Sequence, residues 1–352
     1  MARHALNALL VGPVGAGLLA VSALWRPDPA FGSGTLLVSS DFGHEVLRYD
    51  ATTGAFIDTF IPAAANGGLD QPHGILEVGQ TVLVASFQND RVLRFDRATG
   101  AFIDVMIDNT NGLDAPVMLL LGPDGALYVT SQLSDEVHRY DAATGAFLGV
   151  FVAAGAGGLD GPSGMAFGPD GRLYVAGRFS ADVLAYNGAT GAFEESVVDS
   201  ADGLTSGNTF GIGFADNGDL YVASANQVFR VDVAAGAVVA SVGVSSIGID
   251  PGPGGGMYAA RGGADQIAHI DPATDTVVTN AYLGAGANTP NLLNFFRFIE
   301  EIPGDLNGDG VVDTADLGIL IAMFGAAGGV ADLNDDGVVD TADLGILIGN
   351  FG

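Results

Sequence analysis

The strongest constraint on this chain is an internal repeat that runs from Thr35 to about Glu300. Three copies are nearly identical, with the sequences HEVLRYDATTGAFIDTFI (44–61), DRVLRFDRATGAFIDVMI (90–107) and DEVHRYDAATGAFLGVFV (135–152). Three weaker copies follow at 181–198, 226–243 and 265–282. An Asp or Asn marks the turn of every copy, at Asp50, Asp96, Asp141, Asn187, Asp232 and Asp271. Their spacings of 46, 45, 46, 45 and 39 residues predict the blades of a β-propeller.

Each copy is predicted to form two short strands around a tight turn, because apolar and polar residues alternate on both sides of it. The Asp side chain can cap the turn through the backbone, and a glycine soon after it supplies the positive φ that the returning chain needs. Upstream of most copies, PDG or DNG between apolar runs indicates another hairpin, as in MLLLGPDGALYVTS (118–131). One unit therefore contains four antiparallel strands.

The two ends of the repeat region are predicted to close the ring together. The first unit lacks its innermost strand, because GTLLVSS (34–40) begins directly with the second one. The last unit is followed by NTPNLLNFFRFIEE (288–301), an apolar run placed like an innermost strand. If this run completes the first blade, it covers a sheet edge that would otherwise pair with other chains. The sequence thus predicts a mostly β fold, a six-bladed β-propeller closed by a C-terminal strand.

Composition excludes several classes of function. The formal net charge of −29 leaves no basic patch to neutralise phosphates, which argues against a nucleic-acid partner or an anionic membrane surface. All 12 cationic residues are arginine, so Schiff-base chemistry and a P-loop lysine are excluded. The chain has no cysteine, which excludes disulfides, thiolate nucleophiles and thiolate metal sites. An apolar content of 48% still indicates a folded chain with a core.

The N-terminus predicts an export signal. A short basic start precedes an apolar stretch from Ala5 to about Leu24, and the small residues before position 24 suit cleavage after Ala23. An uncleaved membrane anchor is the alternative, since about 20 apolar residues can span a bilayer. The predicted organisation is a signal peptide at 1–23, a linker at 24–34, the propeller at 35–302 and a small C-terminal module at 303–352.

Two acidic segments of nearly the same sequence form this module, at 304–325 and 331–352. In each, oxygen-bearing side chains stand at positions 1, 3, 5, 9 and 12, glycine at position 6, and a backbone carbonyl is offered at position 7. This spacing is that of an EF-type calcium loop, in which hard oxygen ligands surround a large cation. The predicted ligands are Asp305, Asn307, Asp309, Val311, Asp313 and Asp316 in the first loop, and Asp332, Asn334, Asp336, Val338, Asp340 and Asp343 in the second.

Each loop leads into an apolar stripe that predicts an amphipathic helix. The stripes are Leu317, Leu320, Ile321 and Phe324, and Leu344, Leu347, Ile348 and Phe351. No helical pattern precedes either loop, so each unit is a loop followed by a helix. Residues 304–352 hold nine aspartates and no cationic residue. Two calcium ions would offset much of this charge, so metal binding is predicted to be coupled to folding of the module.

The tandem loops strongly resemble a type I dockerin. The resemblance implies a calcium-dependent module that binds a cohesin on another protein, and dockerins often recruit components that degrade polysaccharides. It also implies partner contacts at loop positions 10 and 11, which are Thr314, Ala315, Thr341 and Ala342 in this chain. Because the two Thr-Ala pairs are identical, either half could present the same face. The alternative is a calcium-stabilised cap without a partner.

The segments QPHGILEV (71–78) and GPDGALYVTS (122–131) resemble NHL-type propellers of the gluconolactonase and streptogramin-lyase group. Gluconolactonase-like members bind a divalent metal at one mouth of the channel through carboxylate and amide side chains. The equivalent strand entrances here carry no matching carboxylate; they are His73, Val117, Ser163, Thr209, Ser246 and Asn291. Streptogramin-lyase-like members use a histidine, which makes His73 a weak catalytic candidate. No other catalytic residue and no organic cofactor site is predicted.

The leading hypothesis is a secreted or cell-surface calcium-binding protein that docks a propeller onto a cohesin-type partner. The propeller itself would bind an unknown protein or glycan, or serve as a scaffold. A lactonase- or lyase-like propeller enzyme that carries a dockerin is one alternative. A surface-anchored adhesin is another, and it requires the N-terminal segment to remain uncleaved.

Overall fold

The computed structural model describes residues 34–300 and 303–351, apart from gaps at 206, 225, 253–254, 262–263, 280–282, 284–292, 307–310 and 335. The predicted signal peptide, the predicted linker except Gly34, Asn291, and the loop residues Asn307 and Asp309 lie outside the described residues. No helix in the described ranges is long and apolar enough to cross a membrane.

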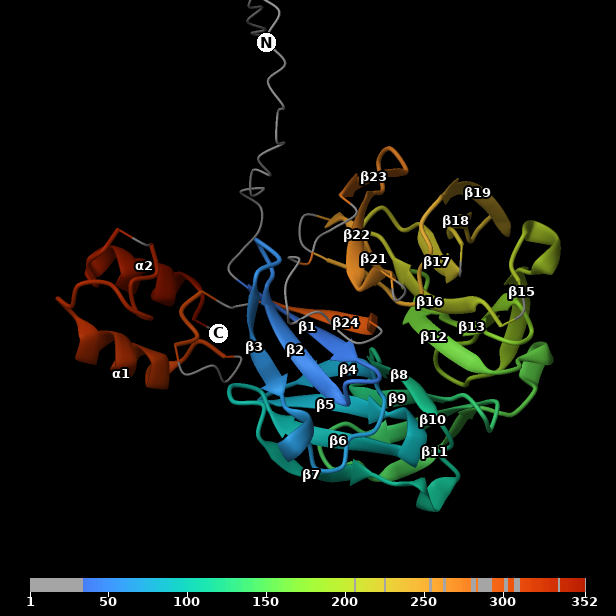
Figure 1. The fold of residues 1–352 in the computed structure, drawn as a ribbon, viewed down its shortest axis with the longest axis horizontal. Helices are drawn as coiled ribbons and strands as arrows, with labels where there is room; N and C mark the ends of the chain where they lie inside the picture. Colours follow the sequence, from blue (N-terminus) through green and yellow to red (C-terminus); the bar gives the residue numbers. More distant parts are fainter. Residues whose placement is uncertain are drawn as a thin grey trace, which may run out of the picture.

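Six four-stranded antiparallel sheets are arranged in a ring around a common centre, as the repeat predicted (Figure 1). The first three blades contain β24 (Leu293–Glu300), β1 (Gly34–Ser40), β2 (Glu45–Asp50) and β3 (Phe56–Ile61); β4 (Pro72–Val78), β5 (Thr81–Ser86), β6 (Arg91–Asp96) and β7 (Phe102–Ile107); and β8 (Pro116–Leu121), β9 (Ala126–Ser131), β10 (Glu136–Asp141) and β11 (Phe147–Val152). The last three contain β12 (Pro162–Phe167), β13 (Leu173–Gly177), β14 (Asp182–Tyr186) and β15 (Phe193–Val198); β16 (Thr209–Phe214), β17 (Leu220–Ser224), β18 (Val228–Asp232) and β19 (Ala237–Val242); and β20 (Ile249–Pro251), β21 (Met257–Arg261), β22 (Gln266–Asp271) and β23 (Thr276–Thr279). Short 3-10 turns link some strands: η1 (Ala63–Ala65), η2 (Phe87–Asn89), η3 (Asn109–Asn111), η4 (Ala156–Gly158) and η5 (Ser200–Asp202).

The turn chemistry of the repeat is confirmed. In the first blade, Oδ1 of Asp50 accepts hydrogen bonds from the backbone N–H of Thr52 at 3.0 Å and of Thr53 at 2.6 Å. Gly54 follows with a φ of +66°. The sixth copy lacks this glycine, and Asp275 takes the left-handed conformation instead, with a φ of +52°.

Ring closure by the C-terminal apolar run is also confirmed. Strand β24 pairs antiparallel with β1, from Gly34 opposite Glu300 to Ser40 opposite Leu293. The Ser39 hydroxyl donates to the carbonyl of Phe295 at 2.8 Å and accepts from the N–H of Phe295 at 3.0 Å. The first blade therefore combines strands from both ends of the propeller, and its inner edge is covered.

The core lies between neighbouring blades, where apolar faces of adjacent sheets pack together. Around the channel the innermost strands approach so closely that side chains are excluded at some positions. A Cβ on Gly164 would lie 2.6 Å from the backbone nitrogen of Ile212 and 2.6 Å from the carbonyl oxygen of Phe210. A glycine on β12 is therefore what allows β16 to pack directly against it.

Two helices, α1 (Thr314–Met323) and α2 (Thr341–Gly349), form a small unit beside the ring (Figure 1). Leu320 of α1 and Leu347 of α2 are fully buried where the two halves of this small unit pack together. The predicted stripes are only partly buried, because Ile321 and Ile348 are 61% and 57% exposed and the Phe residues one turn later are exposed too. Two short helices can bury one narrow seam against each other, so the i+4 and i+7 positions remain on the surface.

We expect Gly164→Ala to lower the free energy of unfolding by about 1–3 kcal/mol, because the added methyl group meets rigid backbone of β16. Urea unfolding measures the change. Gly243→Ala is the matched control: a Cβ on Gly243 has no heavy atom within 4 Å, so this variant should unfold like the parent. Equal stability of the two variants would contradict close packing of the innermost strands.

Candidate functional site

The second acidic loop curls around its own aspartates. Oδ2 of Asp332 accepts from the N–H of Gly337 at 2.9 Å, and Oδ1 of Asn334 accepts from the N–H of Asp336 at 3.0 Å. Gly337 permits this sharp fold with a φ of +93°. Oδ1 of Asp336 in turn accepts from the N–H of Val338 at 3.0 Å. The side-chain oxygens at positions 1, 3 and 5 are thus held along the inside of the loop.

The aspartates at positions 9 and 12 form a capping box at the start of each helix. Asp313 and Asp340 accept from the N–H groups of the first helical turn, while Asp316 and Asp343 accept from the N–H of Asp313 and Asp340. Asp343 also accepts from the N–H of Leu333 at 2.7 Å, and these backbone hydrogen bonds lower its pKa. The position-12 carboxylates therefore connect the beginning of each loop to its helix.

This donor set fits a calcium ion. The loop offers carboxylate, amide and carbonyl oxygens and no nitrogen or sulfur ligand, which is the chemistry that a hard cation prefers. Within the described residues, no three acidic or histidine side chains are already gathered closely enough to hold a metal. Oxygens of Asp332, Asn334 and Asp336 instead accept hydrogen bonds from backbone N–H groups of the same loop. Of the predicted ligands in the first loop, only Asp305, Val311, Asp313 and Asp316 are described.

The four predicted partner-binding residues are all exposed. Thr314 and Ala315 begin α1, and Thr341 and Ala342 occupy the same places at the start of α2. The exposed Ile and Phe side chains of the two helices were not predicted as surface residues. Because the two loop–helix units are nearly identical in sequence, the exposed Thr-Ala pair and the exposed Ile and Phe side chains occur once in each half of the module.

At the channel entrance, His73 packs against an aromatic side chain. His73 stacks on Phe87 with ring centroids 4.5 Å apart, and its Nε2 lies 3.8 Å from Oδ1 of Asp41, beyond hydrogen-bond distance. Burial lowers the pKa of His73 to about 3, and the nearby Arg178 adds to this shift. The imidazole is therefore neutral at ordinary pH and a weak base. Val117, Ser163, Thr209 and Ser246 are buried at the other entrances, and Ser163 donates to the carbonyl of Phe210.

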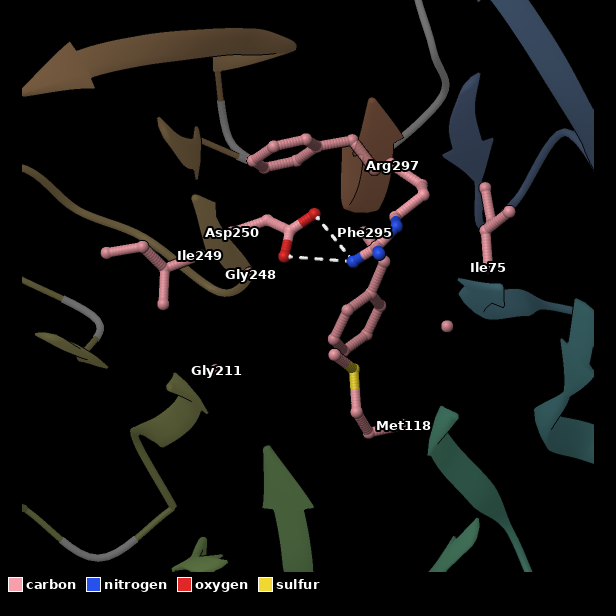
Figure 2. A pocket seen from close by; sticks show the side chains of 10 residues that line it. Ile75, Met118, Gly211, Gly248, Ile249, Asp250, Phe295 and Arg297 are labelled. Atoms are coloured by element: carbon pink, nitrogen blue, oxygen red, sulfur yellow. Dashed lines mark hydrogen bonds and ion pairs between the residues drawn. The ribbon is translucent and has the colours of Figure 1, made fainter. Parts of the chain in front are cut away.

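A second polar group, formed by residues of β20 and β24, lines a pocket between the innermost strands. Nη1 of Arg297 lies 3.3 Å from both carboxylate oxygens of Asp250, and the two side chains point toward each other (Figure 2). The surrounding wall is largely apolar, with Met118 and Phe295 projecting toward the same space (Figure 2). Burial raises the pKa of Asp250 to about 6, although Arg297 opposes the shift.

The family profile of the dockerin type I domain matches residues 303–351. The C-terminal unit is therefore a dockerin type I domain, which confirms the resemblance seen in the tandem loops. Dockerin domains generally bind calcium and typically dock onto cohesin partners, and proteins that carry them are usually extracellular or cell-surface components. No curated protein matches the sequence.

Solved structures confirm the propeller fold. The structural match to a chain of a nidogen/laminin complex covers 76% of this chain and 98% of that chain, with 14% identity and a TM-score of 0.61. The match to a protein of unknown function from Bacteroides caccae covers 76% of this chain and 100% of that chain, with 15% identity and a TM-score of 0.57. Streptogramin lyase and gluconolactonase-like structures are also among the neighbours, with TM-scores of 0.47 and 0.49. At such identities the likeness shows the fold alone.

The raised pKa of Asp250 makes stability depend on pH. Between about pH 4 and 6 the folded chain binds a proton at Asp250 that the unfolded chain does not, so this group stabilises the fold increasingly as pH falls. Relative to Asp250→Asn, the parent should gain about 1 kcal/mol of unfolding free energy between pH 7 and pH 5. Urea unfolding of both proteins at the two pH values measures this difference, in which other titrating groups cancel. A constant difference would show that the carboxyl titrates normally, and a gain at pH 7 would show that the fold lowers its pKa; either result would contradict the prediction.

Proposed function

We propose that this chain is an exported calcium-binding protein whose dockerin module attaches the propeller to a cohesin on another protein. The observation that carries the proposal is the pair of near-identical loop–helix units, each with the same exposed Thr-Ala pair at the start of its helix. The dockerin match to residues 303–351 supports the same reading. The propeller would be the docked cargo, acting as a binding domain or a scaffold.

In this proposal each loop binds one calcium ion. The ligands would be Asp305, Asn307, Asp309, Val311, Asp313 and Asp316 in the first loop, and Asp332, Asn334, Asp336, Val338, Asp340 and Asp343 in the second. Calcium would supply the positive charge that offsets the crowded carboxylates of a small module. The protein's own contribution is to orient the oxygens: in the second loop Gly337 allows the sharp fold, and the capping box connects position 12 to the helix.

The docking face would comprise Thr314 and Ala315 with the exposed side of α1, or Thr341 and Ala342 with the exposed side of α2. Ile321 and Ile348 add apolar area to these faces, and exposed apolar patches of this kind are typical of interaction sites. The face becomes competent only when the loop next to it is ordered, because the Thr-Ala pair lies between loop positions 9 and 12.

Export and assembly complete the proposal. We divide the chain into a signal peptide at 1–23, a linker at 24–34, the propeller at 35–302 and the dockerin module at 303–352. The mature protein would be secreted or held at the cell surface through its partner. Dockerins that recruit polysaccharide-degrading components are the precedent for its setting, so an assembly of that kind is the proposed context.

We expect the full-length protein to bind two calcium ions in isothermal titration calorimetry. Asp305→Asn and Asp332→Asn remove the position-1 carboxylate of one loop each, and either variant should bind one ion. The double variant should give no calcium heat and no calcium-dependent rise in melting temperature. Unchanged stoichiometry in the single variants would contradict the assigned ligands.

The repeated docking face gives a sharper test. Ala315→Asp and Ala342→Asp each place a charge in one face, at a helix N-terminus where an acidic side chain favours the helix. Each single variant should still be captured by a cohesin panel within about twofold of the parent, because the other half is intact. The double variant should lose at least about tenfold in affinity, or 1.4 kcal/mol. Loss of capture in one single variant alone would show that the halves are not equivalent.

A further inference from the structure

The second blade breaks the repeat at two positions that are close in space. The residue after the turn Asp is small or apolar in the other blades, at Ala51, Ala142, Gly188, Val233 and Pro272, but it is Arg97 in the second. The innermost strands also share an apolar register position, occupied by Leu121, Phe167, Phe214, Pro251 and Phe298. In the second blade Glu77 stands at that position. Arg97 and Glu77 form an ion pair.

Arg97 and Glu77 lie on the side of the second blade that is next to the docking module. Nη1 of Arg97 lies 3.5 Å from Oδ2 of Asp305, the position-1 residue of the first calcium loop. The Arg97 and Asp305 side chains are only 11% and 3% exposed. Burial raises the pKa of Glu77, Arg97 and Arg297 oppose the shift, and Asp305 adds to it. A carboxylate that has lost its water needs a countercharge, and Arg97 provides one from the propeller.

The chain path brings the module to this blade. Strand β24 ends at Glu300 and the described part of the module resumes at Pro303, so few residues separate the closing strand from Asp305. Contacts between β24 and β4 place the closing strand against the innermost strand of the second blade. The start of the first loop therefore lies near Glu77 and Arg97, whereas the second loop begins 27 residues farther along the chain.

We propose that Arg97 competes with calcium for the first loop, so that the propeller holds its own docking module until that loop is loaded. The proposal rests on the proposed calcium-binding function of the loops. In the calcium-free chain the guanidinium of Arg97 neutralises Asp305 and fixes the module against the second blade. Calcium bound by the first loop would take Asp305 as a ligand and place a divalent charge beside the guanidinium, which weakens the Arg97–Asp305 contact.

Linkage makes this competition reciprocal. If loading weakens the Arg97–Asp305 contact by some factor, the contact lowers the calcium affinity of the first loop by the same factor. Two loops of nearly identical sequence would thus differ in affinity within the full chain, with the first the weaker. The module would become free of the propeller only at calcium concentrations that fill both loops.

The test is calcium titration of the full chain carrying Asp332→Asn, so that the heat reports the first loop alone. The first and third blades have alanine directly after the turn Asp, so the turn should tolerate Arg97→Ala. We expect it to raise the calcium affinity about fivefold, at the lower end of couplings between sites. Arg97→Lys retains the charge and should stay near the parent. Arg230→Ala, which removes an arginine paired with Asp219 and Asp275 in the fifth blade, should change nothing.

The outcomes separate the two proposals. Absence of calcium binding by the unsubstituted chain would overturn the proposed function and the competition with it. Normal calcium binding with equal or lower affinity in Arg97→Ala would overturn the competition alone. The same comparison with both loops intact, in which one of two sites should tighten, serves if Asp332→Asn prevents the module from folding.

Discussion

Strand β24 pairs with β1 through residues as far apart in sequence as Ser39 and Phe295, and this pairing converts a row of repeats into a ring. Without it the first blade would have three strands and an open inner edge, and each blade's apolar face needs a neighbour on both sides. The same strand leads directly to the dockerin module. One antiparallel contact therefore closes the core and decides where the module begins.

Much of this architecture could be predicted because the same residue types recur at equivalent positions in most blades. Asp50 and Gly54 recur with the chemistry that a tight turn needs, and the missing strand before Gly34 identifies its replacement at the other end. Packing between blades could not be predicted from periodicity. The direct contact of Gly164 with β16 and the placement of Arg297 beside Asp250 depend on how far the sheets rotate around the channel.

The module was predictable for a different reason, since ligand spacing in a short loop is a local property. The doubled role of Asp316 and Asp343 as loop and capping-box residues follows from that spacing. Burial was less predictable: Ile321 belongs to the apolar stripe, but a two-helix unit offers no second surface to cover it. The contact of Arg97 with Asp305 joins separate domains, and its signal was a departure from the repeat, visible only once the copies are aligned.

The register of the closing strand also has a mechanical consequence. Glu300, the last residue before the chain passes to the module, lies opposite Gly34 at the very end of β1. If the module is anchored and the propeller is pulled, tension enters the ring at this end of the ladder. Hydrogen-bonded pairs would then be loaded one after another, as in a zipper, instead of all together in shear. The seam that completes the ring is also the place where a tethered propeller would first be peeled open.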